Sequence, residues 1–250
     1  MAAVTLPRLA WGSPDSARSA LLVHGLGSSG ALMWRLGDAL AAHGWHAVAV
    51  DLRGHGDAPR SLDYTVAAYA SDLVATRAAD GAWDAVIGHS LGGAASTAAA
   101  ASDASWTDRL VLIDPAIRVD GRDAGIIRRS QERAFADQRI ETVREEHPHW
   151  HEHDLELKVD AVRRASRWAV EQTSAQNDPW DVRADAAALT VPTRIIGADP
   201  AVYSLFTGAL AEEVLAANSA ITMSVVAGAG HSPHRDKPED TVRHLLEALA

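Results

Sequence analysis

Short apolar runs alternate with longer helix-like segments through the first 115 residues of the chain. The apolar runs, which have the length of buried strands, are residues 20–23, 46–50, 83–87 and 109–113. Residues 31–43 and 91–101 have helix-like sequences. Thr65 can cap a further helix over residues 66–79. This alternation predicts an α/β fold, in which a mostly parallel sheet has helices on both faces.

The alternation stops over residues 116–189, which are charged and helix-forming and contain no strand-like run. Within them Leu155, Val159 and Val162 recur at helical spacing and would form one apolar helix face. A segment of this length is too long for a loop without structure of its own. We therefore expect residues 116–189 to form a helical lid inserted into the sheet topology.

The strand and helix pattern returns after the predicted lid. The expected elements are strands at 192–197 and 221–226 and helices at 204–217 and 238–249. Pro238 suits the first turn of the last helix. The chain is therefore expected to have one core, built from residues 1–115 and 190–250, and one lid.

Composition narrows the class of protein. The 250 residues carry a formal net charge of −10 without a basic cluster, which argues against a nucleic-acid partner. The absence of cysteine excludes disulfides and thiol catalysis. We see no apolar run long enough to span a membrane and no leader-like beginning, and so expect a soluble cytoplasmic protein with no membrane partner. Abundant alanine and only two lysines suggest a bacterial source.

Ser90 lies in a G-x-S-x-G sequence, residues 88–92, between a strand-like and a helix-like run. A serine on such a sharp strand-to-helix turn holds its hydroxyl out of the sheet, where a substrate can reach it. The two glycines keep side chains out of the crowded turn. Ser90 is therefore a candidate nucleophile.

A serine hydroxyl needs a base within hydrogen-bond reach and a carboxylate that orients the base. His231 ends a glycine-rich turn after the last predicted strand and is the candidate base. His234, three residues further on, is its competitor.

Together these motifs resemble the α/β-hydrolase superfamily over nearly the whole chain. The matching segments are residues 24–27, 51–56, 88–93, 112–115, 191–193 and 228–231. The resemblance implies a sheet of about eight strands with a lid after the sixth, Ser90 as the nucleophile and His231 as the general base. It also implies a structural role for Asp51.

Backbone N–H groups are expected to stabilise the oxyanion that forms during acyl transfer. By the resemblance, one belongs to Leu91, which follows the nucleophile, and the other to Leu26, in the loop after the first predicted strand. The glycine-rich sequence at residues 27–30 could shift the second donor by one residue.

Two aspartates are candidates for the carboxylate that orients His231. Asp199 follows the first strand after the lid, in the usual chain order of Ser, acid and His. The family more often places the acid one residue later, where this chain has Pro200. Asp114 ends the strand after the Ser90 helix, a position that some family members, including certain lactone hydrolases, use instead. The usual order favours Asp199.

Two aromatic and histidine features lie in or near the lid. Four histidines occupy alternate positions over residues 147–153 and could bind a metal on an extended segment. Pro148 makes a lid turn the simpler explanation, so no metal site is expected. The candidate pocket residues are Trp34, Trp150, Trp168 and Trp180, which could line an apolar acyl pocket or pack the lid on the core.

The sequence thus predicts a serine hydrolase that cleaves a small apolar carboxylic ester or lactone through an acyl-serine intermediate, as a monomer or homodimer and without a cofactor. Hydrolysis of a carbon–carbon bond, thioester or amide, acyl transfer and cofactor-free perhydrolysis are alternatives on the same fold. A ligand-binding receptor without activity is a further alternative.

Overall fold

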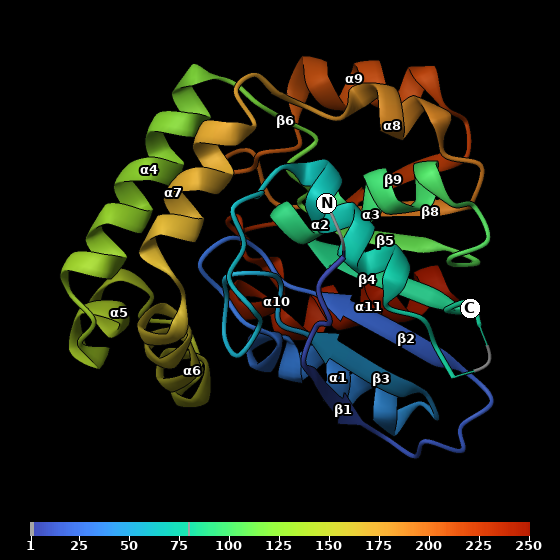
Figure 1. Cartoon of the computed structure of the whole chain (residues 1–250), viewed down its shortest axis with the longest axis horizontal. Helices are drawn as coiled ribbons and strands as arrows, with labels where there is room; N and C mark the ends of the chain where they lie inside the picture. The colour runs from blue at the N-terminus through green and yellow to red at the C-terminus, as the bar shows by residue number, and fades with distance from the viewer. Residues whose placement is uncertain (1–2, 80) are drawn as a thin grey trace.

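Seven strands form the central sheet in the computed structural model, which describes residues 3–79 and 81–250 (Figure 1). Their order across the sheet is β1-β3-β2-β4-β5-β8-β9, and β1 is antiparallel to β3 while the other pairings are parallel. The strands are β1 (Arg8–Trp11), β2 (Ser19–Val23), β3 (His46–Val50), β4 (Ala85–His89), β5 (Leu110–Ile113), β8 (Thr193–Gly197) and β9 (Ile221–Val225).

The mostly parallel sheet agrees with the sequence prediction, with one strand fewer than the expected eight in the described residues. Residues of β2, β4 and β5 are buried almost throughout, as continuous apolar runs in a parallel sheet require. The pattern did not indicate β1, because this edge strand is largely exposed and contains no buried apolar run.

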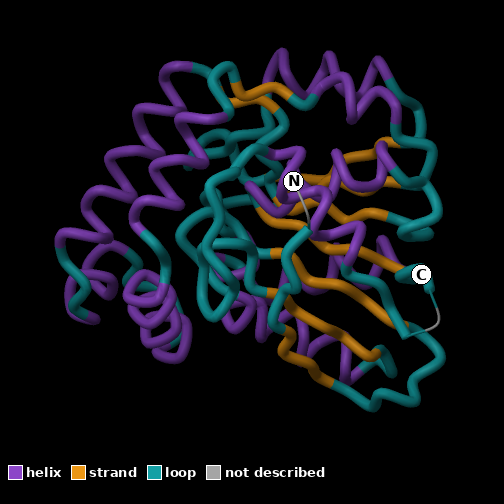
Figure 2. Tube along the Cα trace, in the orientation of Figure 1, coloured by secondary structure: helices purple, strands orange, loops and turns teal. Residues whose placement is uncertain are grey.

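Helices cover both faces of the sheet, as expected (Figure 2). On one face lie α2 (Val66–Ala75), α3 (Leu91–Ser102), α8 (Arg183–Ala188) and α9 (Gly208–Ala217). On the other lie the 3-10 turn η1 (Gly30–Met33), α1 (Trp34–Ala42) and α11 (Pro238–Leu249), preceded by the short α10 (Pro233–Asp236). The Thr65 side chain accepts a hydrogen bond from the N–H of Ala68 and caps α2 as predicted.

A helical insertion separates β5 from β8 and stands beside one end of the sheet in Figure 1. Its helices are α4 (Gly121–Ala136), α5 (Ile140–Glu146), α6 (Glu152–Arg164) and α7 (Arg167–Gln176). The antiparallel pair β6 (Arg118–Val119) and β7 (Trp180–Asp181) closes its base. The insertion follows the fifth strand of the central sheet, because the sixth in chain order, β6, belongs to this separate pair.

Among the described residues, no helix combines the length and the apolar character needed to cross a membrane.

Candidate active site

Ser90 lies between β4 and α3 with a backbone that few side chains tolerate. Its φ of 53° and ψ of −116° place it in a strained turn. A Cβ at Gly88 would lie 2.6 Å from the carbonyl oxygen of Gly92, and a Cβ at Gly92 would collide with the carbonyl of Val23. Both glycines of the G-x-S-x-G sequence are therefore needed for the close approach of α3 to the sheet.

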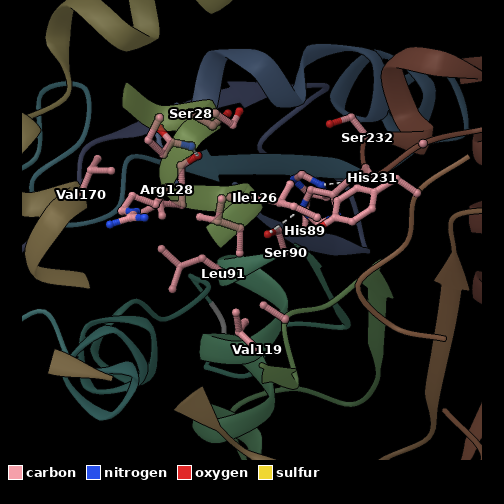
Figure 3. Close-up of a pocket in the computed structure, with 18 of the residues that line it drawn as sticks. Ser28, His89, Ser90, Leu91, Val119, Ile126, Arg128, Val170, His231 and Ser232 are labelled. Carbon is pink, nitrogen blue, oxygen red and sulfur yellow. Dashed lines mark hydrogen bonds between the residues drawn. The ribbon is translucent and has the colours of Figure 1, made fainter. Parts of the chain in front are cut away.

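A continuous hydrogen-bond relay links Ser90, His231 and Asp114. The Ser90 Oγ lies 2.9 Å from His231 Nε2, and His231 Nδ1 lies 2.6 Å from Asp114 Oδ2 (Figure 3 shows Ser90 and His231). A carboxylate can only accept, so Nδ1 carries the proton and Nε2 is left to accept the serine proton. The three side chains come from the ends of β4 and β5 and from the loop after β9.

Asp114 is fully buried and ends β5 with a positive φ of 37°. Its carboxylate accepts hydrogen bonds from Ser204 Oγ at 2.6 Å, from the Leu205 N–H at 3.0 Å and from the Phe206 N–H at 3.2 Å. Burial alone would raise the pKa of Asp114, but the hydrogen bonds from His231 and these donors outweigh it and lower the pKa. Asp114 is therefore held ionised beside His231.

Asp199, which the sequence favoured over Asp114, does not contact His231. Its carboxylate accepts from the Gly228 N–H at 2.7 Å and from the Ala201 N–H at 2.9 Å, and these bonds lower its pKa. The preference for Asp199 is thus corrected, because Asp114 and not Asp199 forms the hydrogen bond to His231. Asp199 instead ties the end of β8 to the turn that precedes His231.

His89 and His234 lie beside the relay but form no hydrogen bond with its side chains. His89 Nε2 donates to the carbonyl oxygen of His231 at 2.8 Å and so anchors the loop that carries the relay histidine. His234 is buried, and its ring packs 4.7 Å from that of His89. The sequence did not indicate this positioning role, because His89 occupies a variable position of the G-x-S-x-G sequence.

The loop that carries Leu26 is held by two buried histidines. His24 Nε2 accepts the Leu52 N–H at 3.0 Å, and His55 Nε2 accepts the Gly27 N–H at 3.1 Å. Burial lowers the pKa of both rings, that of His55 to about 3, so both stay neutral acceptors. The Gly27 N–H is therefore engaged, which argues against shifting the oxyanion donor from Leu26 to residue 27.

Leu91 occupies the first position of α3, where a backbone N–H has no acceptor within the helix. Both Leu26 and Leu91 line the cavity beside Ser90.

Asp51 has the structural role that the resemblance implied. Its carboxylate accepts hydrogen bonds from the N–H groups of Gly30 at 2.8 Å and Asp57 at 2.9 Å and so joins two loops.

The relay opens into a cavity of about 1280 Å³ between the sheet and the insertion. Apolar and charged side chains both contribute to its wall. They include Leu26, Leu91, Ile126, Ile127, Trp150, Val170, Trp180, Tyr203, Arg128, Lys158 and Arg235. The lining is therefore less uniformly apolar than the tryptophans alone suggested.

The four tryptophans divide into two pairs. Trp150 and Trp180 line the cavity, with the Trp180 Nε1–H donating to the Ala116 carbonyl at 2.7 Å. Trp34 lies elsewhere, because its Nε1–H donates to Asp154 at 2.8 Å and fixes α6 to the core. Trp168 is 44% exposed and packs edge-on against Tyr64. Trp34 and Trp168 were expected to line the pocket, and this expectation is wrong, because both pack between the helical insertion and the core.

The histidines of residues 147–153 do not converge on one point. The ring of His147 stacks on Trp150 at 3.8 Å, whereas His151 and His153 both pack on Trp34. His151 also caps α6. Over residues 3–79 and 81–250, no group of three or more His, Asp or Glu side chains is arranged to hold a metal ion.

Comparison with known proteins places these features in a family. The sequence pattern of the alpha/beta hydrolase family matches residues 20–244, and the chain belongs to that family. Lipase LipV of Mycobacterium tuberculosis is 35% identical over 109 residues, which are 43% of this chain and 41% of the lipase. The matched region thus spans about two fifths of that relative's length.

Solved structures resemble the whole chain. An N-formylmaleamic acid deformylase from Pseudomonas putida superposes with a TM-score of 0.80 and 24% identity, over 96% of both chains. An E-2-(acetamidomethylene)succinate hydrolase superposes with a TM-score of 0.82 and 23% identity, over 98% of this chain and 95% of that one. At these identities the likeness establishes the α/β-hydrolase fold.

Proposed function

We propose that the protein is a serine hydrolase that cleaves a carboxylic ester or lactone through an acyl-serine intermediate. The relay from Ser90 through His231 to Asp114, open to a cavity, is the observation that carries this proposal. The lipase among its relatives supports ester chemistry, since a stretch of that protein resembles this chain.

In the first half of the reaction Ser90 Oγ attacks the carbonyl carbon while its proton passes to His231 Nε2. The tetrahedral intermediate then collapses. The bond between the carbonyl carbon and the leaving oxygen breaks, and His231 returns the proton to that oxygen. Asp114 stabilises the imidazolium formed in between, and keeps the ring in the tautomer whose Nε2 can accept.

In the second half water attacks the acyl-serine and His231 takes one of its protons. Collapse of this intermediate releases the carboxylic acid and restores the Ser90 hydroxyl. The sum is one ester and one water converted to one acid and one alcohol; a lactone gives both groups in one molecule.

We assign the two oxyanion donors to the backbone N–H groups of Leu26 and Leu91. Both residues line the cavity next to Ser90, and the Gly27 N–H is already bonded to His55. Two fixed donors act without reorganisation, and losing one such donor typically costs on the order of 100- to 1,000-fold in kcat.

Helices α4 to α7 act in this proposal as the lid of the cavity, whereas α8, which also falls within residues 116–189, packs on the sheet. Ile126 from α4, Lys158 from α6 and Val170 from α7 line the same space as Ser90. The lid thereby limits the size and shape of the acyl and leaving groups.

A panel of 4-nitrophenyl esters, lactones and amides, assayed with wild type and Ser90→Ala, tests the proposal. We expect wild type to hydrolyse short esters and Ser90→Ala to retain no more than background. Electrospray mass spectra of wild type with a slow ester should show a transient mass increase equal to the acyl group. Equal rates in the two proteins would refute the mechanism, and no turnover of any substrate would favour a binding protein.

A further inference from the structure

Arg235 is a buried cation without an anionic partner in the described part of the chain. The side chain lies on α10, four residues after His231, is only 5% exposed and lines the cavity. Its guanidinium stacks over the Trp150 ring at 4.7 Å, and its buried Nε–H has no acceptor among the described residues. The two terminal guanidinium nitrogens form no hydrogen bond or ion pair with the described residues, so on the cavity wall they can bind an anion from outside the chain.

Lys158 places a second cation on the same wall. Its Nζ donates to the Gly27 carbonyl at 3.0 Å, which uses one of three ammonium protons and leaves the side chain beside the Leu26 loop. Burial, with a further contribution from Arg235, lowers the pKa of Lys158 to about 8. No carboxylate within residues 3–79 and 81–250 lies within 4.0 Å of its ammonium nitrogen.

The carboxylates closest to these two cations are engaged by other donors. Asp236 accepts from Trp150 Nε1 at 2.6 Å and from the Gly230 N–H at 2.8 Å. Asp154 accepts from Trp34 at 2.8 Å and from Arg35 at 3.0 Å. Glu146 is exposed and faces Arg133 at 3.7 Å. The acids therefore reduce the positive potential of the wall but leave the free donors of Arg235 and Lys158 unused.

We propose that the substrate carries a carboxylate of its own, which Arg235 and Lys158 bind while Ser90 attacks a carbonyl elsewhere in the same molecule. This inference rests on the proposed hydrolase function and gives its substrate class: monoesters of short dicarboxylic acids and lactones that bear a carboxylate. Arg235 supplies paired, planar N–H donors that match a carboxylate, and Lys158 supplies a second positive charge. The Trp150 ring, which contacts Arg235 at 4.7 Å and His147 at 3.8 Å, holds the guanidinium in place.

Mono-4-nitrophenyl succinate and 4-nitrophenyl butyrate test this inference, because they share the leaving group and the length of the acyl chain but only the succinate carries a charge. We expect wild type to favour the succinate in kcat/KM by tenfold or more. Arg235→Gln should lower that preference by about tenfold or more, since a hydrogen bond to a charged group is lost, whereas Arg235→Lys should retain part of it.

Arg167→Gln is the matched control. Arg167 also lines the cavity, but it is exposed and already paired with Glu171 at 2.8 Å, so its removal lowers the net charge by the same amount without touching Arg235 or Lys158. The preference should be unchanged in this variant. An equal loss in Arg167→Gln and Arg235→Gln would overturn the inference, as would a loss only on removal of the exposed Arg128 at the cavity wall.

A binding measurement separates failure of this inference from failure of the hydrolase proposal. Glutarate titrated into Ser90→Ala should bind, as followed by calorimetry, and should bind at least tenfold more weakly to Ser90→Ala/Arg235→Gln. Glutaramide, its uncharged analogue, should not bind detectably. Ester turnover without a preference for the succinate and without glutarate binding would refute the carboxylate site and leave the hydrolase intact; glutarate binding without turnover would do the opposite.

Discussion

His231 Nδ1 and Asp114 Oδ2 lie 2.6 Å apart although 117 positions separate the two residues in the chain. Ser204 Oγ and the Phe206 N–H donate to Asp114 Oδ1, and the Leu205 N–H donates to Oδ2, so the carboxylate is fixed in the orientation that meets the ring. The buried Asp114 carboxylate therefore accepts four hydrogen bonds, and only the bond from His231 takes part in catalysis in our proposal.

Asp114→Asn should lower kcat for ester hydrolysis by a factor on the order of 10⁴, because an amide cannot hold the histidine in the required tautomer. KM should change much less. Steady-state kinetics at pH near 8 would measure this effect. Asp199→Asn is the control, since Asp199 accepts only from the backbone N–H groups of Ala201 and Gly228, and an amide oxygen can still accept from them; this variant should stay within a few-fold of wild type. A larger loss in Asp199→Asn than in Asp114→Asn would contradict the proposed roles.

The preference for a carboxylate-bearing ester should fall severalfold between about pH 7 and about pH 9. Lys158 binds the carboxylate only when protonated, and its pKa is lowered to about 8, so the charge is present below this pH and is lost above it. The charged groups that face Lys158 are Arg235 from α10 and Glu146 from α5. The rings of His24, His55 and His147 are also near enough for Lys158 to lower their pKa. The ratio of kcat/KM for the succinate and butyrate esters cancels the titration of the relay itself.

Lys158→Arg gives the control for this pH dependence. Arginine keeps its charge at pH 9, so the ratio should stay flat over the range in which wild type declines. An identical decline in both proteins would assign the titration to another group.

Gly92→Ala should destabilise the protein by about 1–3 kcal/mol, because the added methyl group would collide with the backbone carbonyls of Val23 and His24 and neither can move without disturbing β2. Urea unfolding followed by circular dichroism measures the change. Gly121→Ala is the comparison, since a Cβ there meets nothing within 4 Å at the first turn of α4. Because alanine has the higher helix propensity, Gly121→Ala should keep or slightly raise the stability, and a similar loss in both variants would contradict the role of the close approach at Gly92.

Asp72→Ala should cost about 3–5 kcal/mol of unfolding free energy, because it strands Arg53 without its partner in the core. The pair is buried and bidentate, with both bonds at 2.6 Å, and Asp72 also accepts the Val4 N–H at 2.7 Å. Removing the exposed pair of Arg243 and Asp240 by Asp240→Asn should leave the denaturation midpoint unchanged. A midpoint shift in Asp240→Asn as large as that in Asp72→Ala would rule out burial as the cause.

The parallel core could be predicted because its strands are continuous apolar runs whose period and length are visible locally. The His46–Val50 strand and the Pro238–Leu249 helix have the bounds that the pattern indicated. Ser90 could be identified for a similar reason, since its turn imposes glycines at fixed positions.

The acid partner could not be predicted from the same information. Asp114 and Asp199 both follow parallel strands and both precede proline, so local sequence does not distinguish them. The distinction arises from the loop at residues 204–206, which folds back and donates to Asp114. Trp150 and Trp180 do line the cavity, whereas Trp34 could not be assigned locally, since it belongs to α1 but contacts Asp154, 120 positions later.

The two-residue pairing of β6 with β7 brings the ends of the helical insertion together at Val119 and Trp180. This pairing makes α4 to α7 an insertion with two junctions, β6 and β7, which are fixed to each other before the chain re-enters the sheet. A graft that replaces α4 to α7 would begin and end at these two junctions, and it would also have to keep a carboxylate at position 154 for Trp34 and Arg35.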